Sequence, residues 1–406
     1  MRKKREGILL KIVLCICIVL LCVLGVTYWQ FIEQNHKLNI VSNQETIGKV
    51  ITQNVLQEQI EQEESANELF EEYYDKAILK MQEMTLEEKV SQMFLARCPA
   101  NDSTKQVMEE QPGGYILFGR DFENKTEKQV IDMIQEFQNA SKIPMIIGVD
   151  EEGGSVVRVS RNKKLVAEKY KSPQELYAQG GLSKIREDAI EKSQRLKSLG
   201  INLNLAPVAD VSTNPKDFIY DRSFGKEAIE TADYVRTVVE AMQSQNMACT
   251  LKHFPGYGNN KDSHNAVTYD NRSLEEFQTS DFLPFKAGIE TGAPTILVCH
   301  NIVENIEANV PASLSTKVHK ILKEELHFSG LILTDDLAME AVAQYASLEE
   351  VAILAVKAGN DVLLSSDFVK QRDAIVKAVE NKEITEKRIE ESVKKILAYK
   401  FAMKLM

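Results

Sequence analysis

The chain has 406 residues, of which 44% are hydrophobic, so it can bury a sizeable core in one large domain or two ordinary ones. Its formal net charge of −11 argues against nucleic acid as the main partner, because a phosphate-binding surface needs an excess of basic residues. This charge leaves room for a local basic site that binds an acidic ligand.

The N-terminus differs from the remainder of the chain. Residues 1–11 are basic, and residues 12–29, IVLCICIVLLCVLGVTYW, carry no charge. A helix of this length spans roughly 27 Å, close to the thickness of a bilayer core, and Tyr28 and Trp29 stand where an interfacial aromatic belt lies. The basic flank places the N-terminus in the cytoplasm. We therefore expect a retained single-pass anchor in the cell membrane, with the rest of the chain extracytoplasmic.

Two alternatives compete with an anchor. A cleaved signal peptide ordinarily has an apolar region of about 7–15 residues and a small-residue cleavage site, whereas this segment is longer and no A-x-A pattern follows it. A lipoprotein signal would place small residues before Cys22, which instead follows Leu20 and Leu21. Both observations favour the anchor.

Residues 30–73 form a polar stretch that is rich in Gln, Glu and Asn and contains no proline. Ile47, Ile51, Val55 and Ile60 give it a weak helical periodicity. We expect a solvated, partly helical linker between the membrane and the following domain.

The pattern becomes regular over residues 74–406. Thr85 and Glu88 form a capping-box signature that predicts the start of a helix. Eight short apolar runs then alternate with amphipathic stretches: 93–96, 115–118, 145–149, 202–206, 249–253, 295–300, 331–334 and 362–365. Alternating strands and helices indicate parallel β-structure, and eight such units predict an α/β fold of the (β/α)8 TIM-type barrel class. A doubly wound sheet is the alternative, but no Gly-rich nucleotide-binding motif follows any run.

Polar residues follow the apolar runs at the ends where the active sites of such barrels lie. Five of the eight runs lead into polar residues: Asp150; Asp210; Lys252 and His253; His300 and Asn301; Asp335 and Asp336. A single polar residue at a strand end could simply cap the following loop, but polar residues at the ends of five strands together favour a shared polar pocket.

The residue types around this pocket favour one kind of chemistry. No zinc motif and no G-x-S-x-G elbow is present, and the spacing of His253, Asp262 and His264 is not specific for a metal. We therefore expect neither a metal nor another cofactor. Carboxylates, histidines and basic residues together suit glycoside hydrolysis, in which a carboxylate attacks or stabilises the anomeric carbon and an acid protonates the leaving oxygen.

Four motifs carry a resemblance to a known family. They are GVDEEGGSVVR (148–158), DFIYDRSFG (217–225), KHFPGYGNNKDSH (252–264) and ILTDDLAM (332–339). In this order they resemble glycoside hydrolase family 3, and more narrowly its bacterial β-N-acetylglucosaminidases of the NagZ type. The resemblance runs from about Leu79 to the C-terminus, and it implies a catalytic barrel with a retaining mechanism.

The resemblance implies that Asp335 is the nucleophile and that two loop residues, His264 and Asp262, form the acid/base dyad. Histidine titrates near neutrality, so it can give a proton and take it back, and a nearby carboxylate orients its ring. Successive residues of an extended chain point to opposite faces, so only one of Asp335 and Asp336 is expected in the pocket. The resemblance selects Asp335, and Asp336 would then be structural.

The resemblance also implies five sugar contacts, for each of which a buried salt bridge is the alternative: Asp150, Arg158, Arg222, Lys252 and His253. Gly153 and Gly154 are expected to let the backbone approach closely. Tyr257 stands where the family often has a histidine, so we expect altered packing of the loop. We also expect no second domain after the barrel, which makes β-glucosidases that draw an acid/base carboxylate from such a domain poor models.

These features predict a retaining exo-β-N-acetylglucosaminidase, a β-hexosaminidase that acts on a carbohydrate, with peptidoglycan fragments as its expected substrate. Within enzymes, the alternative is a family 3 β-glucosidase or a β-GlcNAc phosphorylase, since a histidine acid/base carries no negative charge to repel phosphate. From another class, the alternative is an inactive glycan-binding protein tethered at the surface. The intact set of Asp335, Asp262 and His264 argues against inactivity.

Overall fold

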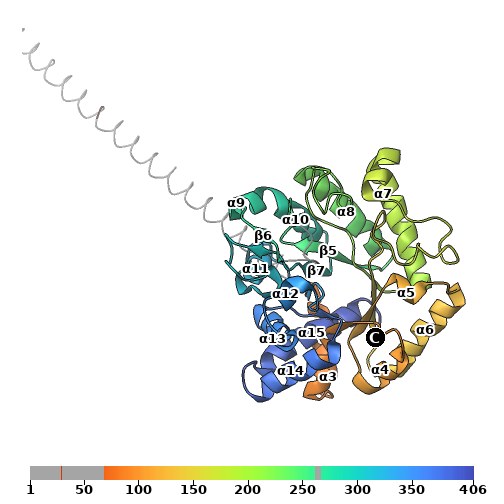
Figure 1. The fold of residues 1–406 in the computed structure, drawn as a ribbon, viewed down its shortest axis with the longest axis vertical. Coiled ribbons are helices and arrows are strands. Elements are labelled where there is room, and N and C mark those ends of the chain that lie inside the picture. Colours follow the sequence, from red (N-terminus) through yellow and green to blue (C-terminus); the bar gives the residue numbers. More distant parts are fainter. Residues whose placement is uncertain (1–28, 30–67, 261–266) are drawn as a thin grey trace, which may run out of the picture. The chain divides into compact units, whose positions relative to one another are not determined.

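Eight parallel strands form the central sheet of the computed structural model, which describes residue 29 and residues 68–260 and 267–406 (Figure 1). The strands are β1 (Phe94–Arg97), β2 (Gly114–Leu117), β3 (Ile146–Val149), β4 (Leu203–Asn204), β5 (Ala248–Phe254), β7 (Thr295–Val298), β9 (Leu331–Thr334) and β10 (Leu363–Ser365). Their order is β10-β1-β2-β3-β4-β5-β7-β9, and a bridge between Leu333 and Val362 brings β9 beside the start of β10. The sheet is a nearly closed barrel, as predicted, and every strand overlaps one of the predicted apolar runs.

Helices surround the strands and connect them (Figure 1). The α-helices are α2 (Tyr74–Met81), α3 (Leu86–Gln92), α4 (Ser103–Glu110), α5 (Gly119–Phe122), α6 (Glu127–Ala140), α7 (Pro173–Ser198), α8 (Ala228–Ser244), α9 (Leu274–Glu276), α10 (Phe282–Glu290), α11 (Thr316–Lys320), α12 (Glu340–Ala343), α13 (Leu348–Ala358), α14 (Phe368–Glu380) and α15 (Glu386–Ala402). Short turns of other helical types are η1 (Glu71–Tyr73), η2 (Phe277–Asp281), η3 (Ala312–Leu314) and η4 (Ile321–Glu325). A small parallel sheet pairs β6 (Tyr269–Asp270) with β8 (Ile302–Val303).

The predicted capping box begins α3. The Thr85 hydroxyl accepts the Glu88 N–H at 3.2 Å, and the Glu88 carboxylate accepts the Thr85 N–H at 3.0 Å. These bonds satisfy two backbone donors that the first turn of a helix leaves without partners, which explains why α3 starts where it does.

The compact unit that contains the barrel spans Glu68–Met406. It therefore begins before residue 74, the residue at which the sequence predicts the start of the barrel domain. Phe70 is buried, and the centroid of its ring lies 5.8 Å from that of Tyr399 in α15. A large aromatic side chain that packs on the last helix explains why this unit extends back to residue 68.

The predicted anchor, residues 12–29, lies outside the described residues apart from Trp29. Residues 30–67 of the predicted linker also lie outside them. In the part of the chain that the structure describes, no helix is both long enough and apolar enough to span a bilayer.

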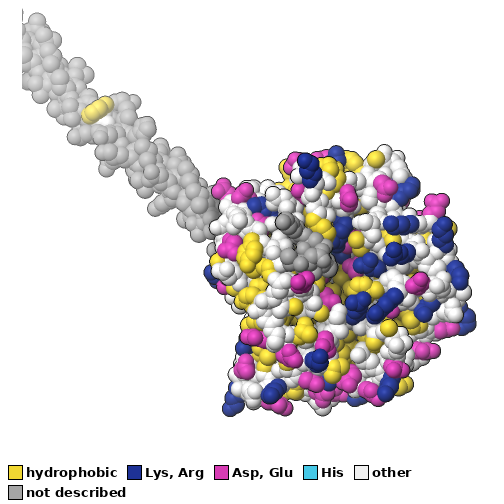
Figure 2. All heavy atoms as spheres, in the orientation of Figure 1, with side chains coloured by type: hydrophobic (Ala, Val, Ile, Leu, Met, Phe, Trp, Pro, Cys, Tyr) yellow, Lys and Arg dark blue, Asp and Glu magenta, His cyan; other side chains and the backbone are white. Residues whose placement is uncertain are grey.

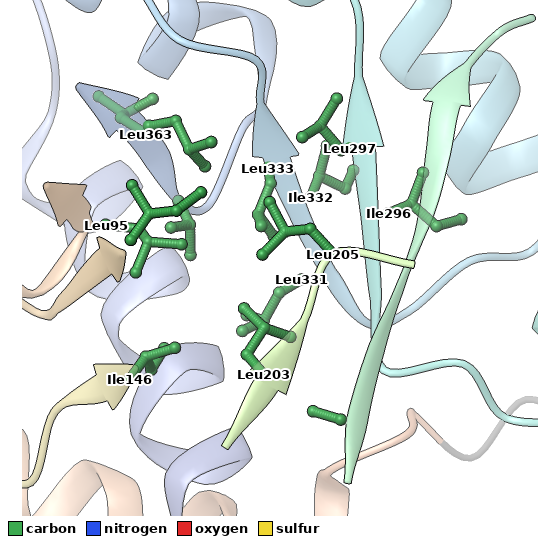
Figure 3. Packing of buried hydrophobic residues seen from close by; sticks show 14 of the residues in the cluster. Leu95, Ile146, Leu203, Leu205, Ile296, Leu297, Leu331, Ile332, Leu333 and Leu363 are labelled. Atoms are coloured by element: carbon green, nitrogen blue, oxygen red, sulfur yellow. The ribbon is translucent and has the colours of Figure 1, made fainter. Parts of the chain in front are cut away.

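Leucines from several strands fill the interior of the barrel. Figure 3 shows Leu95, Leu205 and Leu333 pointing toward one another between the strands, and each of them is about 1% exposed. A Cβ atom at Gly148 of β3 would lie only 3.2 Å from Leu205, so the glycine makes room for that leucine. Burying each leucine contributes roughly 1.5–3 kcal/mol, so the interior is a packed core that fixes the strand ends carrying the site.

Lys400 of α15 is a fully buried amine at the end of the barrel where the strands begin. Its Nζ donates to Gln92 Oε1 at 2.6 Å and to the Gly113 carbonyl at 3.0 Å. Burial lowers the pKa of Lys400 to about 7, because it disfavours the charged form. In the unfolded chain the pKa returns to about 10.4, so between these values the unfolded chain binds the additional proton.

We expect the stability of the protein to rise with pH between about 7 and 10 through Lys400, by at most about 1.4 kcal/mol per pH unit. In Lys400→Met this contribution is absent, because methionine binds no proton. Urea unfolding at pH 7, 8.5 and 10 measures the difference between the two proteins. Lys387→Met, an exposed lysine of the same helix, is the matched control. Parallel pH profiles of wild type and Lys400→Met would contradict the buried titration.

Candidate active site

A pocket of about 570 Å³ lies at the C-terminal ends of the barrel strands, a volume within the usual range for ligand sites. It brings together all six predicted site residues that the structure describes: Asp150, Arg158, Arg222, Lys252, His253 and Asp335. The other two, Asp262 and His264, lie outside the described residues. The structure therefore confirms the expected shared polar pocket. The six described side chains come from β5 and from the segments that follow β3, β4 and β9.

A buried ion network forms one wall of the pocket. Lys252 Nζ lies 2.7 Å from Asp150 Oδ1 and 2.6 Å from Glu152 Oε1. Arg222 donates to both Glu152 oxygens, at 3.0 and 2.8 Å. Burial alone would raise the pKa of Glu152, but the charges of Arg222 and Lys252 outweigh it and hold that pKa well below its usual value. Glu152 is therefore a carboxylate that fixes two cations side by side.

The ring of His253 is held in one tautomer. Its Nδ1 lies 2.7 Å from the buried carboxylate of Asp210, which also accepts the His253 backbone N–H at 3.1 Å. Its Nε2 lies 3.1 Å from Arg222 Nη2. Arginine has only donors, so Nε2 accepts from Arg222 and Nδ1 donates to Asp210. Both ring nitrogens already have protein partners, which gives His253 a part in the network besides its predicted sugar contact.

Glu151 shapes the loop that carries Arg158. Its fully buried carboxylate accepts the backbone N–H groups of Arg158 at 2.7 Å, Val159 at 2.6 Å and Ser160 at 3.1 Å. The Arg158 guanidinium is thereby placed within 3.5 Å of Asp150 Oδ2.

The close backbone approach expected at Gly153 is confirmed. Gly153 has a φ of 104°, a conformation that favours glycine. A Cβ atom there would lie 2.2 Å from the Lys171 carbonyl oxygen. Any larger residue would therefore push the turn at Gly153 away from the segment at Lys171.

Asp335 and Asp336 follow β9, and their carboxylates have different surroundings. Asp335 lines the pocket, and its Oδ1 accepts the Asp336 N–H at 2.9 Å. The Asp336 carboxylate accepts the N–H groups of Ala338 at 2.9 Å and Ser366 at 3.2 Å, so it joins this turn to the turn after β10. His300 also reaches this turn, with its Nε2 3.0 Å from the Asp336 carbonyl oxygen. Asp336 also lines the pocket, so the expectation that only one of the two aspartates would lie there is wrong, but its carboxylate is bonded to these two turns.

Tyr257 packs in the stem of the loop that begins after β5. It is 1% exposed, and its ring lies edge-on to His253 at 5.3 Å. Its backbone N–H donates to Asp210 Oδ1 at 2.8 Å. Arg272 holds the same stem, because it bonds the Gly256 carbonyl at 3.2 Å and Asp281 Oδ2 at 2.8 Å.

The sequence predicts no partner for several residues on which this geometry depends: Glu151, Glu152, Asp210 and Arg272. Asp210 follows an apolar run and Glu152 belongs to a motif, but neither pattern reveals a partner distant in sequence. No sequence signal pointed to Arg272.

The chain is similar to known proteins over most of the residues that the structure describes. Residues 85–399 match the model of the glycosyl hydrolase family 3 N-terminal domain. The chain is 33% identical over 262 residues to a protein of Idiomarina loihiensis named beta-hexosaminidase, covering 62% of this chain and 75% of that protein. A protein of Haemophilus influenzae with the same name is 30% identical over 275 residues, covering 67% of this chain and 77% of the relative.

A solved structure of the same family is also similar to this chain. The family 3 β-N-acetylglucosaminidase of Paenibacillus sp. strain FPU-7 superposes with a TM-score of 0.74 at 32% identity, covering 79% of this chain. The chain spans 63% of the length of that protein. The match to the family model covers well over half of the chain and includes every strand of the barrel. The chain therefore belongs to glycosyl hydrolase family 3 and is a glycoside hydrolase.

Proposed function

We propose that the protein is a retaining exo-β-N-acetylglucosaminidase, which removes terminal β-linked GlcNAc from glycans. The observation that carries this proposal is the pocket itself. The Lys252–Glu152–Arg222 network and Asp150 present paired charges suited to sugar hydroxyls, and Asp335 supplies a carboxylate from another strand of the same pocket. Relatives named beta-hexosaminidase support the choice of sugar.

The proposed reaction has two steps. Asp335 attacks the anomeric carbon, the glycosidic bond breaks, and His264 gives its proton to the leaving oxygen. Water then attacks the glycosyl-aspartate while His264 takes a proton from it, which releases GlcNAc and restores both groups. Asp262 orients the His264 ring and favours its protonated form during the first step.

Peptidoglycan fragments with a non-reducing terminal GlcNAc are the proposed substrate, and the proposed location is outside the cell membrane. The uncharged segment 12–29 and its basic flank support a membrane anchor. A phosphorylase is the second candidate, because a histidine acid/base would not repel phosphate.

Hydrolysis of an aryl β-GlcNAc, compared with the matching aryl β-glucoside, tests the proposal. We expect release of GlcNAc by the wild type, little cleavage of the glucoside, and a loss of roughly 10²–10⁴-fold in kcat/KM for His264→Ala. The assay is run with and without inorganic phosphate, and the products are identified. GlcNAc 1-phosphate as the main product would establish the phosphorylase, and faster cleavage of the glucoside would establish a β-glucosidase.

A further inference from the structure

We infer that a basic surface on the segment between β3 and α7 binds a linear polymer of phosphate groups. This basic platform consists of five exposed side chains: Arg161, Lys163, Lys164, Lys169 and Lys171. None of the five lines the catalytic pocket. The platform is therefore a second contact surface of the protein, and it does not depend on which sugar the pocket cleaves.

The charge of the basic platform is opposite to that of the whole chain. Residues 158–171 contain six Lys and Arg and one acidic residue, Glu168, in a chain whose net charge is −11. Figure 2 shows basic side chains gathered on this face, between the positions of α5 and α7 in Figure 1. A concentration of charge of one sign raises the local concentration of anions.

The cations of the platform form no ion pairs with acidic side chains among the described residues. Exposed lysines on other faces of the protein do form such pairs. Lys320 Nζ lies 3.5 Å from Glu324, and Lys370 Nζ lies 3.0 Å from Asp367. The platform therefore keeps unneutralised ammonium groups that can bind an anionic ligand.

Two carboxylates close to the platform are bonded to other groups. Glu175, in the first turn of α7, accepts the Ser172 N–H at 2.8 Å and so caps the helix. Glu127 lies 3.0 Å from Arg195, whose Nε also donates to the Leu165 carbonyl in the platform segment at 2.9 Å. Neither carboxylate is free to pair with the platform.

Polar contacts fix the backbone of the segment that carries the platform. The Asn162 side-chain amide donates to the Phe122 carbonyl at 2.8 Å and to the Lys125 carbonyl at 2.7 Å, at the end of α5 and just beyond it. Near the other end of the segment, the Tyr170 carbonyl accepts the Gly154 N–H at 3.0 Å. A surface whose backbone is already ordered loses less conformational entropy on binding.

The platform extends from α5 to α7. Lys164 Nζ donates to the Asn124 carbonyl just after α5 at 3.0 Å, whereas Lys171 Nζ donates to Gln179 Oε1 within α7 at 3.2 Å. One small anion contacts only one or two such side chains, but a polymer with regularly spaced charges contacts several at once. Each contact releases counterions and adds to the affinity.

The inner edge of the platform indicates where the polymer lies. Lys169 and Lys171 share a groove of about 400 Å³ with Asp221, which also lines the catalytic pocket. The Asp221 carboxylate repels an anion on that side. We therefore place the polymer over the outer cations, Arg161, Lys163 and Lys164, with Lys169 at its edge, and not in the catalytic pocket.

The residue types favour phosphate over other anions. Four of the five cations are lysines, which bind phosphate as point charges, whereas the planar fork of arginine suits a carboxylate. Tyr170 is only 7% exposed, and none of the large exposed hydrophobic side chains of the described residues belongs to residues 154–176. The platform therefore offers no aromatic face to nucleic-acid bases and no apolar side chain to a lipid surface.

Removing three charges from the platform tests the inference. The probe is fluorescently labelled long-chain inorganic polyphosphate, and anisotropy measures its binding at several salt concentrations. We expect the triple variant Lys163→Gln, Lys164→Gln, Lys169→Gln to bind about 10-fold more weakly or worse. The slope of log K against log[salt] should fall by about 2, since each contact to a flexible strand contributes about 0.7. Arginine at the same three positions should keep the affinity, because it keeps the charge.

The matched control removes three exposed lysines outside the platform by the same change to glutamine: Lys286, Lys320 and Lys370. This control has the same net charge as the platform variant and should bind polyphosphate like the wild type. Both variants should hydrolyse an aryl β-GlcNAc like the wild type, since none of the six lysines lines the catalytic pocket. Thermal melting confirms that each variant is folded. An unchanged affinity in the platform variant, or equal losses in the two variants, would overturn the inference.

Two further probes distinguish a phosphate polymer from other anions. Poly-glutamate presents carboxylates, and vesicles that contain phosphatidylglycerol present phosphate on a lipid surface. We expect the wild type to bind both more weakly than polyphosphate. Tighter binding of either one would assign the platform to that ligand and contradict the inference.

Discussion

Asp335→Asn is expected to lower kcat for an aryl β-GlcNAc on the order of 10³-fold or more, with little loss of stability. The amide is a poor nucleophile and cannot form the glycosyl-enzyme. The fold should persist, because the asparagine carbonyl can still accept the Asp336 N–H that Asp335 accepts at 2.9 Å. Single-turnover kinetics and mass spectrometry of the intact protein measure the turnover and the covalent intermediate.

Asp336→Asn is the matched control for this prediction. Its carboxylate accepts N–H groups from Ala338 and Ser366 instead of being needed for chemistry, so this variant should keep far more activity than Asp335→Asn. If Asp336→Asn is the inactive variant and Asp335→Asn turns over normally, the nucleophile has been assigned to the wrong aspartate.

Glu152→Gln is expected to lower the free energy of unfolding by about 3–5 kcal/mol and to weaken substrate binding. In the wild type the Glu152 carboxylate lies within 3.0 Å of both Arg222 and Lys252. The substitution leaves these two cations buried beside a neutral amide. Asp150 still contacts Lys252, so Arg222 loses the most. Urea unfolding measures the stability, and KM for an aryl β-GlcNAc reports the binding.

Glu127→Gln is the control for Glu152→Gln, because it removes an ion pair at the surface instead of one that is buried. Glu127 lies 3.0 Å from Arg195, but its side chain is 49% exposed. Removing an exposed ion pair should change the stability little, because water screens it, and activity should not change. Equal losses of stability in the two variants would show that burial adds nothing to the Glu152 network.

The sequence predicted the barrel because its strands are short, apolar and regularly spaced, and because the strand ends carry the polar residues. It did not predict what those residues touch. Glu151 and Glu152 are adjacent in sequence, yet Glu151 bonds the backbone of its own loop, whereas Glu152 bonds Arg222 in the loop after β4 and Lys252 in β5. Such partners depend on how a loop folds back, which local periodicity does not encode. The roles of Asp262 and His264, and the anchor at 12–29, remain predictions.

The single carboxylate of Asp210 has a consequence for how this enzyme could change. It accepts the backbone N–H groups of His253 and Tyr257 and lies 2.7 Å from Nδ1 of the His253 ring, so the ion network of the pocket wall and the stem of the loop after β5 share one attachment point. A substitution that reshapes either would disturb both. The ends of β1 and β2 are joined in a different way, because Arg120 bonds the Cys98 carbonyl and lies 3.5 Å from Asp121, which accepts the Phe118 N–H at 2.7 Å. Two side chains share that attachment, whereas at Asp210 a single carboxylate carries it, so substitutions at Asp210 should be the least tolerated of those around the pocket.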